Sequence, residues 1–167
     1  VELDSLKSRK SQIPEVNMRL RKQILADLRI SEADLPFAGE LLKVRDGQSA
    51  WEGALERVLH NFGLSVLVSD ADYKRVSSYI DKTDLKGRLV YFRVLTGIKY
   101  PLRDGISRKS LLDKLEIKGD TIFYDWIEKE LAERFNLVCC ETIEEFQREG
   151  DAVTKQGQHK KGKIRHE

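Results

Sequence analysis

The first apolar pattern in the sequence is a seam of aliphatic residues through a highly charged amino-terminal stretch. Between residues 2 and 29 the seam residues are spaced seven, three or four positions apart, with few residues that break helices. This spacing places side chains on one face of a helix, as in one strand of a coiled coil. Pro14 fits the first turn of a new helical segment, because inside a helix it removes a hydrogen bond. The predicted seam consists of Leu6, Ile13, Val16, Leu20, Ile24 and Leu28.

From residue 37 the pattern changes to short apolar runs that alternate with amphipathic stretches. Residues 37–44 and 86–95 have strand character, and residues 64–68 form a continuous apolar run, typical of a strand covered on both faces. Residues 51–62 repeat apolar positions at helical spacing, and a second helix is expected over 70–80, capped by its first residue. This order predicts an α/β layer with parallel neighbouring strands. The apolar stripe of the first helix, expected in the core, consists of Trp51, Ala54, Leu55, Val58, Leu59 and Phe62.

Several residues match known signals for the ends of helices. Ser49 and Glu52 have the spacing of a capping box, and Thr142 and Glu145 repeat it. Gly63 suits the left-handed residue that ends a helix. The sequence therefore predicts a helix that begins near Ser49 and ends at Gly63.

The second half of the chain predicts two further helices, a strand and a third helix. Residues 107–115 favour a short helix and residues 121–135 a longer one, followed by a strand over 136–140 and a helix opened by Thr142. Residues 152–167 predict a short extended segment, a glycine-bearing basic turn and the start of a departing element.

These patterns divide the chain into three parts and place it in the α/β class. The parts are a coiled-coil segment (1–30), an α/β body with a mixed sheet and flanking helices (35–151), and a basic exit segment leading back to the coil (152–167). The sequence begins within a repeating pattern and without methionine, so we expect a piece of a longer protein. No apolar run approaches the ~18 to 20 residues that a membrane span needs, and no signal peptide is evident.

The net charge of +2 is distributed unevenly. Residues 1–30 carry +3 and residues 152–167 carry +4, which leaves −5 for the residues between them. Basic ends of this type are suited to the phosphates of duplex DNA, and the tail lacks aromatic residues for stacking on single strands. The alternative for the tail is a solvated basic turn without a ligand. The DNA-binding candidates are Arg19, Arg21, Lys22, Lys155, Lys160, Lys161, Lys163 and Arg165.

Motifs for chemistry are weak. The sequence contains neither a phosphate-binding loop of the form GxxxxGK[ST] nor a GxGxxG motif after a strand, so no cofactor is expected here. His60 and Asn61 end the first helix of the body, where hydrogen bonding at a structural joint outweighs general-base chemistry. Cys139 and Cys140 are adjacent and indicate two partly buried thiols on a strand in a reducing compartment, so we expect a cytoplasmic protein without a metal site.

The body resembles the hinge of an SMC-type ATPase. In such hinges a helix leads to a buried strand and then to a helix opened by Asp, as in SAWEGALERVLHNFGLSVLVSDADYKRVSSYI (residues 49–80). The stretches LPFAGELLKVRDGQSAWEGALERVLHNFGLSVLV, GRLVYFRVL, FYDWIEKELAERF and AVTKQGQHKKGKIRHE are similar to the MukB-like SMC subunit of the Wadjet plasmid-defence condensins. The similarity spans residues 35–167.

The resemblance implies a homodimerising hinge at the tip of long coiled coils. ATP and Mg²⁺ would be bound by a head domain outside this chain, and kleisin, KITE-type and nuclease subunits of the complex would not be contacted here. The exit segment lacks the serine- and glycine-rich pattern of ordinary SMC hinges, so a toroidal dimer is not assured by the resemblance.

The sequence thus favours a non-catalytic hinge that homodimerises and contacts duplex DNA weakly near the coil junction. One alternative is a small metal-dependent nuclease or phosphotransferase-like domain that uses acidic residues and His60. Another is a protein-interaction module without DNA binding.

Overall fold

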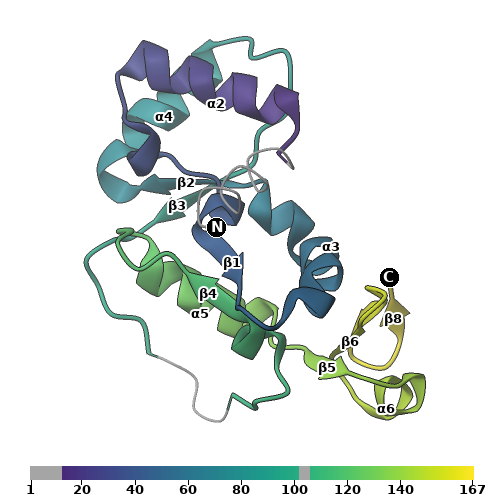
Figure 1. Cartoon of the computed structure of the whole chain (residues 1–167). Coiled ribbons are helices and arrows are strands. Elements are labelled where there is room, and N and C mark those ends of the chain that lie inside the picture. Colours follow the sequence, from purple (N-terminus) through teal and green to yellow (C-terminus); the bar gives the residue numbers. More distant parts are fainter. Residues whose placement is uncertain (1–12, 102–105) are drawn as a thin grey trace.

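The computed structural model describes residues 13–101 and 106–167 (Figure 1). With the labels of Figure 1, the helices are α2 (Glu15–Leu28), α3 (Glu52–Gly63), α4 (Asp70–Lys82), α5 (Tyr124–Arg134) and α6 (Ile143–Arg148). The strands are β1 (Leu42–Val44), β2 (Val66–Ser69), β3 (Tyr91–Val94), β4 (Leu115–Ile117), β5 (Val138–Cys140), β6 (Ala152–Thr154), β7 (His159–Lys161) and β8 (Arg165–His166). Short 3-10 helices cover Glu32–Asp34, Ala38–Leu41, Ser49–Trp51 and Leu111–Lys114.

The strands form small sheets of mixed direction, which confirms the predicted α/β class. β2 and β3 pair in parallel, as the strand–helix–strand order predicts, with α4 as the crossover between them. β1 pairs antiparallel with β4, which sequence analysis did not separate from the preceding short helix. The remaining strands form a four-stranded sheet in the order β5-β6-β7-β8.

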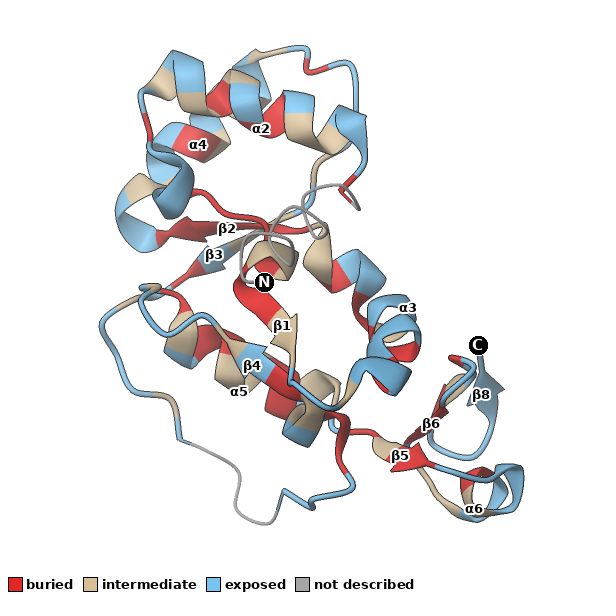
Figure 2. Ribbon diagram, in the orientation of Figure 1, coloured by how far each residue is buried: buried red, intermediate tan, exposed pale blue. Residues whose placement is uncertain are grey.

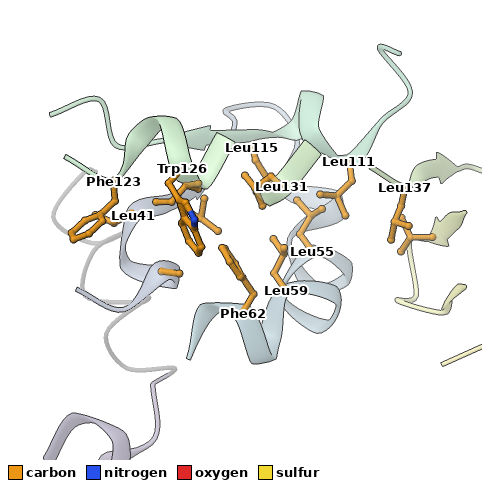
Figure 3. Packing of buried hydrophobic residues seen from close by; sticks show 14 of the residues in the cluster. Leu41, Leu55, Leu59, Phe62, Leu111, Leu115, Phe123, Trp126, Leu131 and Leu137 are labelled. Carbon is orange, nitrogen blue, oxygen red and sulfur yellow. The ribbon is translucent and has the colours of Figure 1, made fainter. Parts of the chain in front are cut away.

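The main core lies between α3 and α5 and uses the predicted stripe of α3. Leu55, Leu59 and Phe62 point from α3 toward Trp126 and Leu131 of α5 (Figure 3). The buried positions alternate along α3 with exposed ones at helical spacing, as Figure 2 shows. Periodicity therefore predicted this face of the helix correctly.

A second core joins α2 to α4 and the buried strand β2. Ile24 of α2 is fully buried together with Val68 of β2 and Val76 of α4, and α2 lies beside α4 (Figure 1). Part of the predicted seam thus packs inside this chain, although Val16 is 49% exposed. Leu6 lies outside the described residues. The division into three segments stays a prediction, but α2 shares a core with the body.

Position 63 requires glycine for a different reason from the one predicted. Gly63 is the last residue of α3 and lacks the positive φ of the predicted left-handed cap, because the glycines of that type are elsewhere. A Cβ atom on Gly63 would lie 3.5 Å from the Cα atom of Gly39, and one on Gly39 would lie 3.0 Å from the carbonyl oxygen of Gly63. The two glycines allow the end of α3 to approach the turn before β1 closely.

The predicted helix caps are only partly found. Ser49 and Glu52 do not form a capping box, because Ser49 starts a short 3-10 helix and α3 begins at Glu52 without a side-chain cap. Asp70 is the first residue of α4, after Ser69 as the cap residue, rather than the cap itself. Thr142 does cap α6, since its hydroxyl accepts the N–H of Glu145 at 3.1 Å.

The carboxyl-terminal segment contains the predicted extended stretch and glycine-bearing turn, and both belong to a sheet. β6 pairs in parallel with β5, and β7 and β8 continue the sheet as an antiparallel meander. Its turns use Gly157 (φ 94°) and Gly162 (φ 66°), in the left-handed region that glycine favours. Residues 152–167 therefore complete a small sheet together with residues 138–140.

Arg21 fixes α2 to the body through a buried charge cluster. It is 2% exposed, and its guanidinium pairs with the carboxylate of Glu40 and, at 3.1 Å, with that of Glu32. The guanidinium carbon lies 4.5 Å from the centre of the Phe37 ring, and the Glu40 carboxylate also accepts the N–H of Phe37 at 2.9 Å. Arg21 and Glu40, the two buried members of the cluster, neutralise each other, so neither is left as an unpaired charge in the interior.

The first prediction tests the core face of α3. Leu55 is 1% exposed. Leu55→Ala should lower the unfolding free energy by about 2–5 kcal/mol, because the substitution leaves a cavity in a packed core. His60→Ala, at an exposed position of the same helix, should change the unfolding free energy by less than about 0.5 kcal/mol. Urea unfolding of both variants measures the difference, and equal stabilities would show that the assigned face of α3 is wrong.

The second prediction tests the Arg21 cluster. Arg21→Met should lower the unfolding free energy by about 3–5 kcal/mol, because Glu40 then keeps a buried charge without its main partner. Adding Glu40→Gln should restore part of that loss, since the amide oxygen can still accept the N–H of Phe37. A double variant less stable than Arg21→Met would contradict this account.

Candidate assembly and nucleic-acid surfaces

Arg19 and Lys22 are the two predicted DNA-binding residues that α2 presents to solvent. Arg19 Nη2 donates to the carbonyl oxygen of Lys86 at 3.5 Å, and the loop after α4 packs on α2 there, with Gly87 next to Leu20. Arg21 points the other way, so its charge is used inside the protein rather than offered to a ligand.

Lys86 and Arg88 extend this basic surface and were missed by sequence analysis. Both are exposed and follow α4, close to the contact between Arg19 and the loop. They lie more than sixty positions from Arg19 in the sequence, and no periodicity links them to it. Only the packing of the loop on α2 brings them together.

Lys160 is buried, although its position in a basic tail suggested an exposed phosphate contact. It is 3% exposed, and its Nζ atom lies 4.7 Å from the centre of the Phe146 ring. β7 places neighbouring residues on opposite faces, so Lys160 covers α6 while Lys161 is exposed. A cation above an aromatic face is a structural contact, and Lys160 presents no charge to solvent.

The other basic residues of the tail are exposed. Lys155 pairs with Glu141 at 2.7 Å, and Arg165 pairs with Glu167 at 3.2 Å. Lys161 lies directly opposite Arg165 in the β7–β8 pair, and Lys163 is in the turn between them. Glu167 offsets the charge of Arg165, so Lys161 and Lys163 are the cations that this hairpin presents to an anionic neighbour.

The two basic groups are far apart within the chain. α2 lies at the top of Figure 1, while β6 and β8 lie at its lower right, beyond α3. The expectation that both ends gather their cations on one side of the body is therefore wrong for a single copy of the chain. The carboxyl-terminal segment folds onto β5.

Among the described residues, β3 and β8 each have an edge without a strand partner, as do β1 and β4 in their own two-stranded sheet. β3 is paired on one side only, in a two-stranded sheet, and β8 is the last strand of its sheet. Exposed apolar residues lie beside both edges: Val90 (42%) and Leu95 (50%) flank β3, and Ile164 (93%) precedes β8. Open edges with apolar flanks are surfaces on which another strand can pair.

Candidate residues for catalysis show no assembled centre within the described ranges. His60 is exposed, and its backbone carbonyl accepts the N–H of Leu64 at 3.2 Å as α3 ends. Across residues 13–101 and 106–167, no group of three or more His, Cys, Asp or Glu side chains is placed to hold a metal ion. Within the same ranges, no helix is both long enough and apolar enough to cross a bilayer.

Cys139 and Cys140 lie on a strand and are not bonded to each other, as the sequence predicted, and both are more deeply buried than expected. They project to opposite faces of β5, Cys139 into the main core and Cys140 toward Phe146. Burial raises the pKa of the Cys139 thiol to about 12, and burial also raises the pKa of Cys140. Both are therefore protonated at neutral pH, and a protonated thiol is a poor nucleophile and metal ligand.

Comparisons with known proteins place this fold among SMC hinges. No family model and no curated protein matches the sequence. The Pyrococcus furiosus Smc hinge domain with an extended coiled coil is similar with a TM-score of 0.66 and 19% identity, over 97% of this chain and 57% of that one.

Two other solved hinge domains agree. The Pyrococcus furiosus SMC protein hinge domain gives a TM-score of 0.62 and 19% identity over 99% of this chain and 86% of that one. An asymmetric dimer of the Geobacillus stearothermophilus SMC hinge domain gives a TM-score of 0.58 and 17% identity, over 96% of this chain and 65% of that one. This chain therefore spans just over half of the first structure and about two thirds of the third. At these identities the likeness establishes architecture, and the chain has the fold of an SMC hinge domain.

Proposed function

We propose that this chain is the homodimerisation hinge of an SMC-like, DNA-loop-extruding motor in anti-plasmid defence. The hinge fold and the sequence stretches similar to the MukB-like subunit of Wadjet condensins support this proposal. ATP and Mg²⁺ would then be bound by a head domain elsewhere in a longer protein, in the cytoplasm. The kleisin, KITE-type and nuclease subunits would bind outside this chain.

The observation that carries the proposal is the pair of open strand edges. β3 and β8 lie on opposite sides of the molecule in Figure 1, and both have unpaired edges among the described residues. A dimer with twofold symmetry must use each contact twice. Pairing β3 of one copy with β8 of the other would satisfy these two edges in both copies.

The third prediction tests assembly through these edges. The wild-type chain should be a dimer at tens of micromolar, and Leu95→Glu combined with Ile164→Glu should make it a monomer, because a charge would be buried at each edge. Ile122→Glu, at a 55% exposed position between β4 and α5 and in neither of these sheets, is the control and should leave the dimer intact. Light scattering after gel filtration measures the mass.

Two results would count against this assembly. A folded wild-type chain that stays monomeric at this concentration would refute dimerisation. A dimer that survives Leu95→Glu with Ile164→Glu would refute the edges as its interface, and unchanged melting temperatures would show that the variants remain folded.

Weak duplex binding is the second part of the proposed function, and two separate surfaces support it. One combines Arg19 and Lys22 with the loop at Lys86, and the other is the hairpin with Lys161 and Lys163. Contacts to phosphates release counterions, so binding should be independent of base sequence and weaken with salt.

The fourth prediction separates these surfaces. Arg19→Glu with Lys22→Glu and, separately, Lys161→Glu with Lys163→Glu should each weaken duplex binding. The slope of the logarithm of the binding constant against the logarithm of the salt concentration should also become shallower, by about 0.9 for each phosphate that the variant no longer neutralises. Lys99→Glu with Lys118→Glu, exposed elsewhere, is the charge-matched control. Fluorescence anisotropy of a labelled duplex measures both quantities, and a wild type without salt-dependent binding would favour the module that binds protein alone.

A further inference from the structure

A groove runs between α5 and residues 112–117, which include β4, and no residue of β3 or β8 lines it. Its volume is about 430 Å³, within the range of about 300–1,000 Å³ that binding sites commonly have. β4 lies beside α5 in the lower half of Figure 1, and one side of α5 forms a wall of the groove. Its apolar floor is formed by Leu112, Leu115, Ile117, Leu131 and Ala132.

The floor of this groove is only partly covered. Leu112 and Ile117 are half-buried, and Ile106 at the rim is 41% exposed. Tyr124 adds a half-buried ring whose hydroxyl makes no hydrogen bond within the described part of the chain. Apolar surface with an amphipathic aromatic residue is typical of a protein-binding site, because such side chains bury large areas at low entropic cost.

The rim of the groove is acidic. Asp113, Glu116 and Glu128 line it together with a single cation, Arg45. Arg45 lies 3.9 Å from Glu116 and offsets that carboxylate, at an exposed position. Asp113 and Glu128 have no ion pair with any described residue, so the described lining of the groove has more negative than positive charge.

We propose that this groove binds a basic amphipathic segment of another protein, with apolar side chains on the floor and Lys or Arg at the rim. Complementary charge selects such a segment, and the apolar floor supplies the affinity. Nucleic acid is disfavoured, because the carboxylates of Asp113 and Glu128 would repel phosphates. The proposed dimer edges at β3 and β8 lie outside the groove, so this binding goes beyond the proposed function.

The test uses a defined probe and the 167-residue chain. The probe is a fluorescein-labelled synthetic helical peptide of leucine and lysine, with lysine along one face, and its counterpart carries glutamate at every lysine position. The lysine peptide should bind the wild type at physiological salt, and the glutamate peptide should not. Anisotropy titrations at several salt concentrations give the affinities.

Variants with a matched control locate the site. Asp113→Lys with Glu128→Lys should weaken binding of the lysine peptide about tenfold or more, since two attractive pairs become repulsive. Glu52→Lys with Glu144→Lys changes the net charge equally at exposed positions of α3 and α6, and should leave the affinity within about twofold. Ile117→Thr should weaken binding several-fold without changing its salt dependence, because it removes apolar surface from the floor and no charge.

Several results would overturn the proposal. If the groove variant and the control variant lost equal affinity for the lysine peptide, the peptide would be attracted by the net charge of the protein alone. Unchanged binding by Ile117→Thr would remove the apolar floor from the interaction. Dissociation of the dimer by Asp113→Lys with Glu128→Lys, with an unchanged melting temperature, would show that a second copy of the chain occupies the groove. A monomeric wild type would refute the proposed dimer and leave this test valid.

Discussion

The packing of Phe62 holds the main elements of the fold together. From the end of α3 its ring contacts Phe92 of β3 and Trp126 of α5, each with ring centres 6.1 Å apart, and Phe135 at 5.5 Å. The Arg134 guanidinium covers this cluster, 5.6 Å from the centre of the Phe62 ring. Aromatic contacts of this type fix mutual orientation as well as burying area. One face of β3 is therefore packed on the main core, which holds its open edge in a fixed position relative to α3 and α5.

The Arg21 cluster has a comparable role for α2. A buried ion pair adds little net stability over an apolar pair, but it strongly disfavours arrangements that separate the charges. Glu40 lies beside Gly39, which packs against Gly63 at the end of α3. α2 is thus linked through one turn to α3, and through α4 to β3, so its orientation is coupled to both cores.

Sequence patterns predicted those features that depend on a single element. The stripe of α3 and the buried strand β2 follow from periodicity and from an uninterrupted apolar run, and both were correct. The errors arise where tertiary neighbours decide. Gly63 is explained by its approach to Gly39 rather than by its own dihedral angle.

The candidate site shows the same limit. Composition identified basic ends, but not which lysines reach solvent. Lys160 is buried because β7 alternates its faces and α6 covers one of them. Arg21 is buried because Glu40, nineteen positions away, supplies a counter-charge. Lys86 belongs to the basic surface of α2 only because its loop packs there.

The separation of the two basic groups within one chain has a consequence for the proposed dimer. α4 packs on β3 and α2 packs on α4, so the edge of β3 and the cations of α2 belong to the same half of the molecule. In the proposed dimer, pairing β8 of one copy with β3 of the other brings Lys161 and Lys163 to that half of the partner. Cations that are distant in a single chain would then approach one another across the interface. Because counterion release grows with the number of phosphates contacted together, duplex binding should depend on dimerisation more strongly than on either basic group alone.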